Sequence, residues 1–99
     1  MHVHNVLFWL KSGATAEDRA ALEAGFALLM KDPAIGSAYC GVPADTHRDV
    51  VDRSYDYGLT LVFGDLAGHD AYQVGPVHQK FVGDHKDKWQ RVQVVDIET

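Results

Sequence analysis

The first ten residues alternate between two sets of side chains, as the residues of a β-strand do. One set, which would share one face of the strand, is His2, His4, Val6, Phe8 and Leu10. The other set is Val3, Asn5, Leu7 and Trp9, so apolar residues occur on both faces. We therefore predict a strand from His2 to Lys11, with both of its faces at least partly covered.

A helical spacing of apolar residues follows this strand. The residues that share the predicted buried face are Leu22, Phe26, Leu29 and Met30. Thr15 is suited to the N-cap position just before them. Because Pro33 disfavours helical backbone at Asp32, the predicted helix runs from about Ala16 to Lys31.

The rest of the chain divides into five shorter elements. Periodicity and the positions of glycine and proline predict strands at 35–42, 55–63 and 89–97, and helices at 66–74 and 77–86. Gly75 and Pro76 separate the two short helices, because glycine suits the end of one helix and proline the start of the next. The resulting order, βαββαβ, is that of an α+β, ferredoxin-like domain with helices over one face of a four-stranded antiparallel sheet. Residues 1–99 are accordingly expected to form a single domain.

The sheet face without helices would carry Val3, Leu7 and Trp9 together with apolar residues of the last strand. In a monomer this patch would lie in water. We therefore expect a homodimer in which two sheets pack face to face about a two-fold axis.

Composition narrows the classes of partner. The 99 residues carry a net charge of −5, and their basic residues are scattered, which gives no electrostatic reason to bind nucleic acid or an anionic membrane. No segment has the features of a signal peptide or the length of a membrane span, so a cytoplasmic location is expected. Cys40 is the only cysteine, which excludes an intramolecular disulfide, and we expect it to be buried and inert.

Tyr72 and His78 are the strongest candidates for chemistry. On an unbroken helix, side chains six residues apart would point about 120° away from each other. The break at Gly75-Pro76 removes that constraint and lets both face a common space. His78 could then act as an acid or base, and Tyr72 could donate a hydrogen bond to a carbonyl that gathers charge. The structural alternative is a histidine that bonds a nearby carbonyl and a tyrosine whose ring only packs.

The sheet would supply the other wall of such a pocket. His4 and Tyr57 are expected to face the helices and to line one cavity with Tyr72 and His78. The apolar residues expected around the same cavity are Val6, Phe8, Phe26 and Phe81.

A metal site was the other possibility that the six histidines raised. His2 and His4 share a strand face, and His85 lies one helical period beyond His78, but no spacing of a known metal motif occurs. We expect neither a metal nor another cofactor. His47 and His69 are expected on the solvated surface, and Asp96 is expected to have a structural role, such as pairing with Lys11 or Arg91.

Five short motifs, in this order, resemble the stress-responsive dimeric α/β-barrel (Dabb) family over nearly the whole chain. They are His4 to Lys11, Tyr55-Asp56, Phe63 to Asp65, Tyr72-x-x-x-Pro76-x-His78 and Val94-Val95-Asp96. The resemblance implies a ferredoxin-like fold and a homodimer. In a plant polyketide cyclase of the family, a histidine and a tyrosine that match His78 and Tyr72 act as base and carbonyl partner, and His4 matches a pocket histidine.

Two departures from that cyclase imply a more apolar pocket, namely Tyr57 in place of a histidine and Phe26 in place of a tyrosine. The first hypothesis is thus a small homodimeric protein that binds a carbonyl or aromatic compound and performs cofactor-free, cyclase- or lyase-like chemistry. The alternatives are a non-catalytic stress-responsive protein and, more weakly, a cofactor-free monooxygenase.

Overall fold

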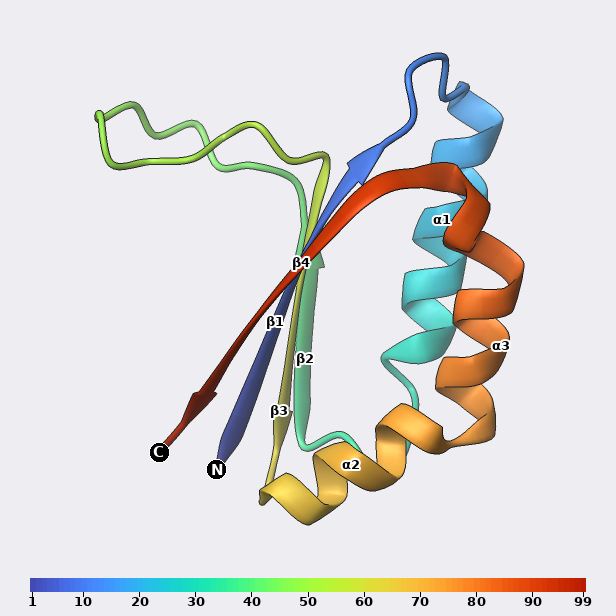
Figure 1. Cartoon of the computed structure of the whole chain (residues 1–99), viewed down its shortest axis with the longest axis vertical. Helices are drawn as coiled ribbons and strands as arrows, with labels where there is room; N and C mark the ends of the chain where they lie inside the picture. Colours follow the sequence, from blue (N-terminus) through green and yellow to red (C-terminus); the bar gives the residue numbers. More distant parts are fainter.

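The computed structural model, which describes all residues Met1–Thr99, is a four-stranded antiparallel sheet with three helices over one face (Figure 1). The strands are β1 (His2–Leu10), β2 (Ser37–Gly41), β3 (Tyr57–Phe63) and β4 (Trp89–Glu98). The helices are α1 (Ala16–Leu29), α2 (Leu66–Val74) and α3 (Pro76–His85), and a 3₁₀ turn, η1 (Lys86–Lys88), leads into β4. The strand order is β2-β3-β1-β4. The predicted ferredoxin-like βαββαβ fold is therefore confirmed.

The element boundaries follow from local chemistry. Helix α1 begins with a complete capping box, in which the Thr15 side chain accepts from the Asp18 N–H and the Asp18 carboxylate accepts from the Thr15 N–H, both at 3.0 Å. It ends at Leu29, two residues earlier than predicted, and β2 is shorter than predicted at both ends. Pro76 occupies the first turn of α3, where its missing N–H costs no helical hydrogen bond.

The core lies between the sheet and the helices. Its fully buried side chains are Leu22, Phe26, Leu29, Leu61 and Phe63. Inward-facing residues of β1 and β3 alternate with half-buried ones, as the period of two predicted. The two ends of the chain meet at one end of the sheet, where the Met1 amine donates to the Thr99 carbonyl at 2.5 Å (Figure 1).

The face opposite the helices is partly covered by the chain itself. Trp9 is buried, because Arg91 lies 4.1 Å from the centre of its ring and its indole N–H donates to Ser54 at 3.1 Å. The aromatic part of the predicted open patch is thus shielded within one subunit. The aliphatic part of the patch remains accessible. Ile97, which pairs with Val3 across the β1–β4 ladder, is 52% exposed, and Val95 is exposed to a similar extent.

Residues 42–56 connect β2 to β3 and extend away from the sheet on the side opposite the helices (Figure 1). Cys40, near the start of this connection, is exposed, which corrects the expected burial. Partial burial, followed by the charge of Glu23, nevertheless raises the pKa of its thiol to about 11. The thiol is therefore protonated at neutral pH. None of the three helices has both the length and the apolar character that a bilayer crossing requires.

Candidate functional site

Tyr72 and His78 lie together across the break between α2 and α3. Their ring centroids are 5.0 Å apart, and the rings are inclined at 53°. Gly75 is both the C-cap of α2 and the N-cap of α3, with extended backbone that turns the chain. The turn brings the two side chains to one space, which an unbroken helix would not do.

A backbone carbonyl orients the imidazole of His78. Its Nδ1 lies 2.9 Å from the carbonyl oxygen of Gln73. Because a carbonyl oxygen only accepts, the proton resides on Nδ1 and the Nε2 lone pair is left free. Burial lowers the pKa of His78, and the nearby His69 lowers it further, against the opposing effect of the Gln73 carbonyl. The neutral, proton-accepting form is therefore favoured at neutral pH.

Tyr72 is buried almost completely, at 2% exposure, and its ring packs on Phe63 at 5.2 Å between centroids. Burial raises the pKa of its phenol, and the charge of Asp32 adds to the effect. The phenol therefore keeps its proton throughout the physiological range. A protonated phenol can donate a hydrogen bond but does not serve as a base.

A cavity of about 130 Å³ lies beside this pair. It is bounded by β1, β3, β4 and all three helices. Its lining comprises His4, Val6, Phe8, Leu29, Leu59, Tyr72, Gln73, His78, Phe81, Val82, Trp89, Val92 and Val94. The β4 residues Val92 and Val94 are 37% and 48% exposed, whereas most of the other lining residues are buried. The cavity therefore opens past the edge of β4. An apolar cavity of about 150 Å³ admits benzene, so this one suits a compound of about one ring.

Six of the eight residues predicted for the pocket line this cavity, and two do not. The two are Tyr57 and Phe26, which line a separate hollow together with Glu23 and Cys40. The hydroxyl of Tyr57 donates to Glu23 at 2.5 Å, toward α1 rather than toward His78. Strand order contributes to this: β3 and β4 lie on opposite sides of β1, and the only β3 residue that lines the cavity is Leu59.

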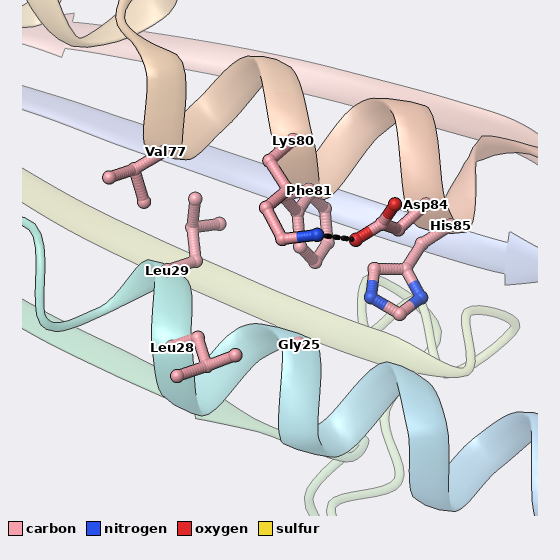
Figure 2. A pocket seen from close by; sticks show the side chains of 8 residues that line it. All are labelled: Gly25, Leu28, Leu29, Val77, Lys80, Phe81, Asp84 and His85. Carbon is pink, nitrogen blue, oxygen red and sulfur yellow. Dashed lines mark hydrogen bonds and ion pairs between the residues drawn. The ribbon is translucent and has the colours of Figure 1, made fainter.

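A larger groove of about 300 Å³ separates α1 from α3 (Figure 2). It lacks both Tyr72 and His78, and its rim carries the ion pair between Lys80 and Asp84 at 2.8 Å. Leu29 and Phe81 line this groove as well as the smaller cavity, so they form the wall between the two. We regard the smaller cavity as the candidate site, because the Tyr72–His78 pair and His4 line it together.

His85 closes one end of the groove. Its imidazole lies over Gly25 of α1, where an added methyl group would come within 2.5 Å of Nε2. It also packs on Phe81, at 5.2 Å between ring centroids. His85 therefore does not join His2 and His4, and the combination of His2, His4, His78 and His85 considered from the sequence does not form.

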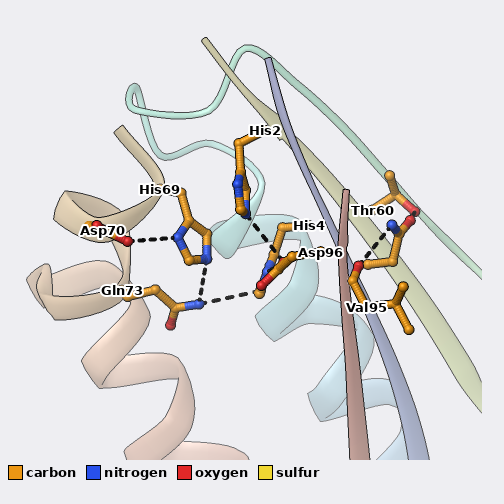
Figure 3. A network of polar contacts seen from close by, with 9 residues as sticks. His2, His4, Thr60, His69, Asp70, Gln73, Val95 and Asp96 are labelled. Atoms are coloured by element: carbon orange, nitrogen blue, oxygen red, sulfur yellow. Dashed lines mark hydrogen bonds and ion pairs between the residues drawn. The ribbon is translucent and has the colours of Figure 1, made fainter. Parts of the chain in front are cut away.

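A polar cluster adjoins the cavity at the α2 end (Figure 3). The His4 Nδ1 lies 2.6 Å from an Asp96 oxygen, and the Gln73 amide nitrogen lies 3.4 Å from His4 Nε2 and 3.2 Å from His69 Nε2. Since one amide group has two protons, Gln73 can donate to both imidazoles. His4 then donates from Nδ1 to Asp96.

Two sequence-based expectations fail in this cluster. His69 is buried at 8% exposure, not solvated, and Asp96 contacts His4 instead of Lys11 or Arg91. His69 and Tyr72 are three residues apart on α2 and so share its buried face. That spacing was visible in the sequence and could have predicted the burial of His69. By contrast, His47 is exposed, as expected.

The sheet topology and helical layer define a ferredoxin-like α+β protein with a cavity beside the α2–α3 break. The family model described as the stress responsive A/B barrel domain, Dabb, matches residues 3–99. The chain therefore belongs to the Dabb family. No curated protein sequence matches it significantly.

Solved structures show the same fold. An Arabidopsis thaliana protein is 20% identical with a TM-score of 0.83, and the alignment covers 100% of this chain and 95% of that one. A dimeric ferredoxin-like protein of unknown function from Thermobifida fusca is 16% identical, with a TM-score of 0.81 and coverages of 99% and 90%. A hydroxynitrile lyase from Passiflora edulis is 17% identical, with a TM-score of 0.79 and coverages of 97% and 90%.

Proposed function

We propose that the cavity beside Tyr72 and His78 binds a small carbonyl or aromatic compound and promotes cofactor-free acid–base chemistry on it. The observation that carries this proposal is the hydrogen bond from His78 Nδ1 to the Gln73 carbonyl. It leaves a neutral imidazole with a free Nε2 at the wall of an apolar cavity. A base in this state, held in place by the backbone, is suited to taking a proton from a bound substrate.

In the proposed reaction, His78 Nε2 removes a proton from the carbon beside a carbonyl group. The electron pair moves onto the carbonyl oxygen, and the Tyr72 hydroxyl donates a hydrogen bond to the resulting enolate. The proton then returns from the imidazolium to carbon or to a leaving group. A lyase or cyclase reaction would use the same two groups, and the fold is shared with a hydroxynitrile lyase.

Deuterium exchange tests the proton transfer without knowledge of the natural substrate. Small aryl ketones would be incubated with the protein in D₂O, and loss of the α-hydrogen signal would be followed by ¹H NMR. We expect exchange above the buffer rate with the wild-type protein, none with His78→Ala, and unchanged exchange with the surface control His47→Ala. Aromatic hydroxynitriles would be assayed in parallel for release of the carbonyl product. Exchange that survived His78→Ala would show that His78 is not the base.

A homodimer is the second part of the proposal. The apolar residues left open on the face without helices include Val95 and Ile97, and the projecting 42–56 segment adds Val50, which is 80% exposed. A second copy of the sheet would cover this face and complete a dimeric α/β barrel. The structurally similar protein from Thermobifida fusca is dimeric, which supports a dimer for this chain.

A non-catalytic, ligand-holding role is the competing function. It is favoured by the nearly complete burial of Tyr72, which suits a packing role as well as a catalytic one. A protein of this kind would bind small aromatic compounds in the same cavity and show no exchange with any of them.

A further inference from the structure

Both ring nitrogens of His2 are buried without a hydrogen-bond partner. The residue is only 5% exposed. Its Nε2 lies 3.3 Å from an Asp96 oxygen, which is within ion-pair distance but outside the directions of a hydrogen bond. Buried polar groups are nearly always satisfied, so an imidazole in this state indicates that something else binds there.

His2 is one member of a compact group of donors. One ligand atom from each of His2, His4, His69 and Asp96 lies within 4.8 Å of all the others. In a tetrahedral site with bonds of ~2.1 Å, ligand atoms are about 3.4 Å apart. The His2 to Asp96 separation of 3.3 Å is close to that value. His4 and Asp96, now hydrogen-bonded at 2.6 Å, would move apart as the ion replaces the proton between them. Side-chain rotations would bring in His69, since all four ligand atoms already lie within 4.8 Å of one another.

We propose that His2, His4, His69 and Asp96 bind one divalent transition-metal ion, with zinc as the expected occupant. Three imidazoles and one carboxylate form the kind of nitrogen and oxygen set that zinc accepts. Calcium and magnesium prefer oxygen donors, and this cluster offers a single carboxylate. This proposal departs from the sequence-based expectation of no metal.

The surroundings of the cluster suit this occupant. Outside the cluster, His69 Nδ1 lies 3.1 Å from the Asp70 carboxylate. A carboxylate that accepts from the second nitrogen of a histidine fixes the ring and strengthens the first nitrogen as a ligand.

Four protein ligands would close a tetrahedral site, which is the pattern of structural zinc. The ligands come from β1, α2 and β4, so the ion would join the edge strand to both the sheet and the helical layer. Every residue of β4 after Trp89 is exposed, so the bound ion would stabilise the position of this strand more than that of the others. This inference does not rest on the proposed acid–base reaction.

Metal binding can be measured directly on protein without a histidine tag. The wild-type chain, first dialysed against a chelator, would be titrated with ZnCl₂ by calorimetry and with CoCl₂ by visible absorption, which reports tetrahedral coordination. We expect one ion per chain, tetrahedral cobalt bands, and a higher melting temperature with zinc. Affinity should fall at least about 100-fold in His69→Ala, because even a second-shell partner is worth ~10–100-fold.

Asp96→Asn is a second test variant that is expected to fold. It preserves the size of the side chain and a hydrogen-bond acceptor but removes the anionic ligand. It should also lose most of the zinc affinity, with its circular dichroism unchanged. His47→Ala removes a histidine outside the cluster, and His78→Ala removes the proposed base, and both should bind zinc as the wild type does. No stoichiometric uptake by the wild type, or uptake that persists in both His69→Ala and Asp96→Asn, would overturn the proposal.

Discussion

The imidazole of His78 packs against the phenol of Tyr72, with 5.0 Å between the ring centroids, although the two residues belong to different helices. The close approach depends on the chain reversal at Gly75. It gives one half-buried histidine both a fixed tautomer and an aromatic wall.

The proposed exchange reaction should depend on pH through His78. Its pKa lies below the usual 6.5, mainly because of burial, so the basic form dominates at pH 7 and is lost only as the pH falls through the lowered value. The exchange rate measured by NMR should therefore be flat from about pH 7 upward and should fall in the acid range. A rate that rose continuously through neutral pH would contradict a base with a lowered pKa.

The free energy of unfolding should also fall as the pH is lowered. Between the lowered folded pKa of His78 and its unfolded value of 6.5, the unfolded chain binds more protons, so stability rises with pH across that window. Each full unit of difference is worth ~1.4 kcal/mol. Urea denaturation of the wild type and His78→Gln at several pH values from 5 to 7.5 would measure this. The substitution should flatten the slope, and equal slopes in both proteins would contradict it.

Tyr72→Phe separates packing from chemistry. The ring stays in the core, so the free energy of unfolding should change by less than about 1 kcal/mol, whereas Tyr72→Ala should cost ~3–5 kcal/mol. If the hydroxyl holds an enolate, its removal should slow exchange by roughly 10²–10³-fold. Full activity in Tyr72→Phe would remove the phenol from the mechanism.

Gly25→Ala tests the contact between α1 and His85. The new methyl group would come within 2.5 Å of His85 Nε2, so the imidazole must swing toward solvent. Burial is the main cause of the lowered pKa of His85, so the pKa should rise toward 6.5 in this variant. The gain of ~1 kcal/mol from replacing a helical glycine by alanine should offset much of the lost packing.

An NMR titration of the imidazole would give this pKa. Gly83→Ala, at a helical glycine with nothing near its added methyl group, serves as the control and should leave His85 unchanged. If the pKa of His85 did not change in Gly25→Ala, the helix α1 would have shifted to make room for the methyl group, and the imidazole would have stayed in place.

Ile97→Lys should break the proposed dimer. The side chain lies on the sheet face without helices and is 52% exposed in one subunit, so a charge there costs the monomer little but would be buried in a sheet-to-sheet interface. Light scattering after size exclusion should show a dimer for the wild type and a monomer for the variant. Val77→Lys, on the helical side, should remain dimeric. A dimer that survived Ile97→Lys would place the interface elsewhere.

Much of the fold followed from local pattern. The period of two in β1, the N-cap at Thr15 and the Gly75-Pro76 break predicted the elements within a few residues. These features are encoded by neighbours in sequence, where backbone geometry fixes which side chains share a face. On α2 the expectation of a solvated His69 was wrong, because His69 is buried whereas Leu66 is 47% exposed. The spacing of His69 and Tyr72 is present in the sequence, but only the packing of α2 against β1 and β3 decided that their face is the buried one.

The sequence by itself determined the α+β fold and placed Tyr72 and His78 on either side of a chain reversal. Only the tertiary structure decided which residues join them. Strand order put Tyr57 on the other side of β1, and the β1–β4 register set Asp96 opposite His4. Asp96 and His4 are 92 positions apart, and their meeting depends on a ladder between the first and last strands. No local spacing encodes such a contact, because strand pairing brings together residues whose separation along the chain is arbitrary.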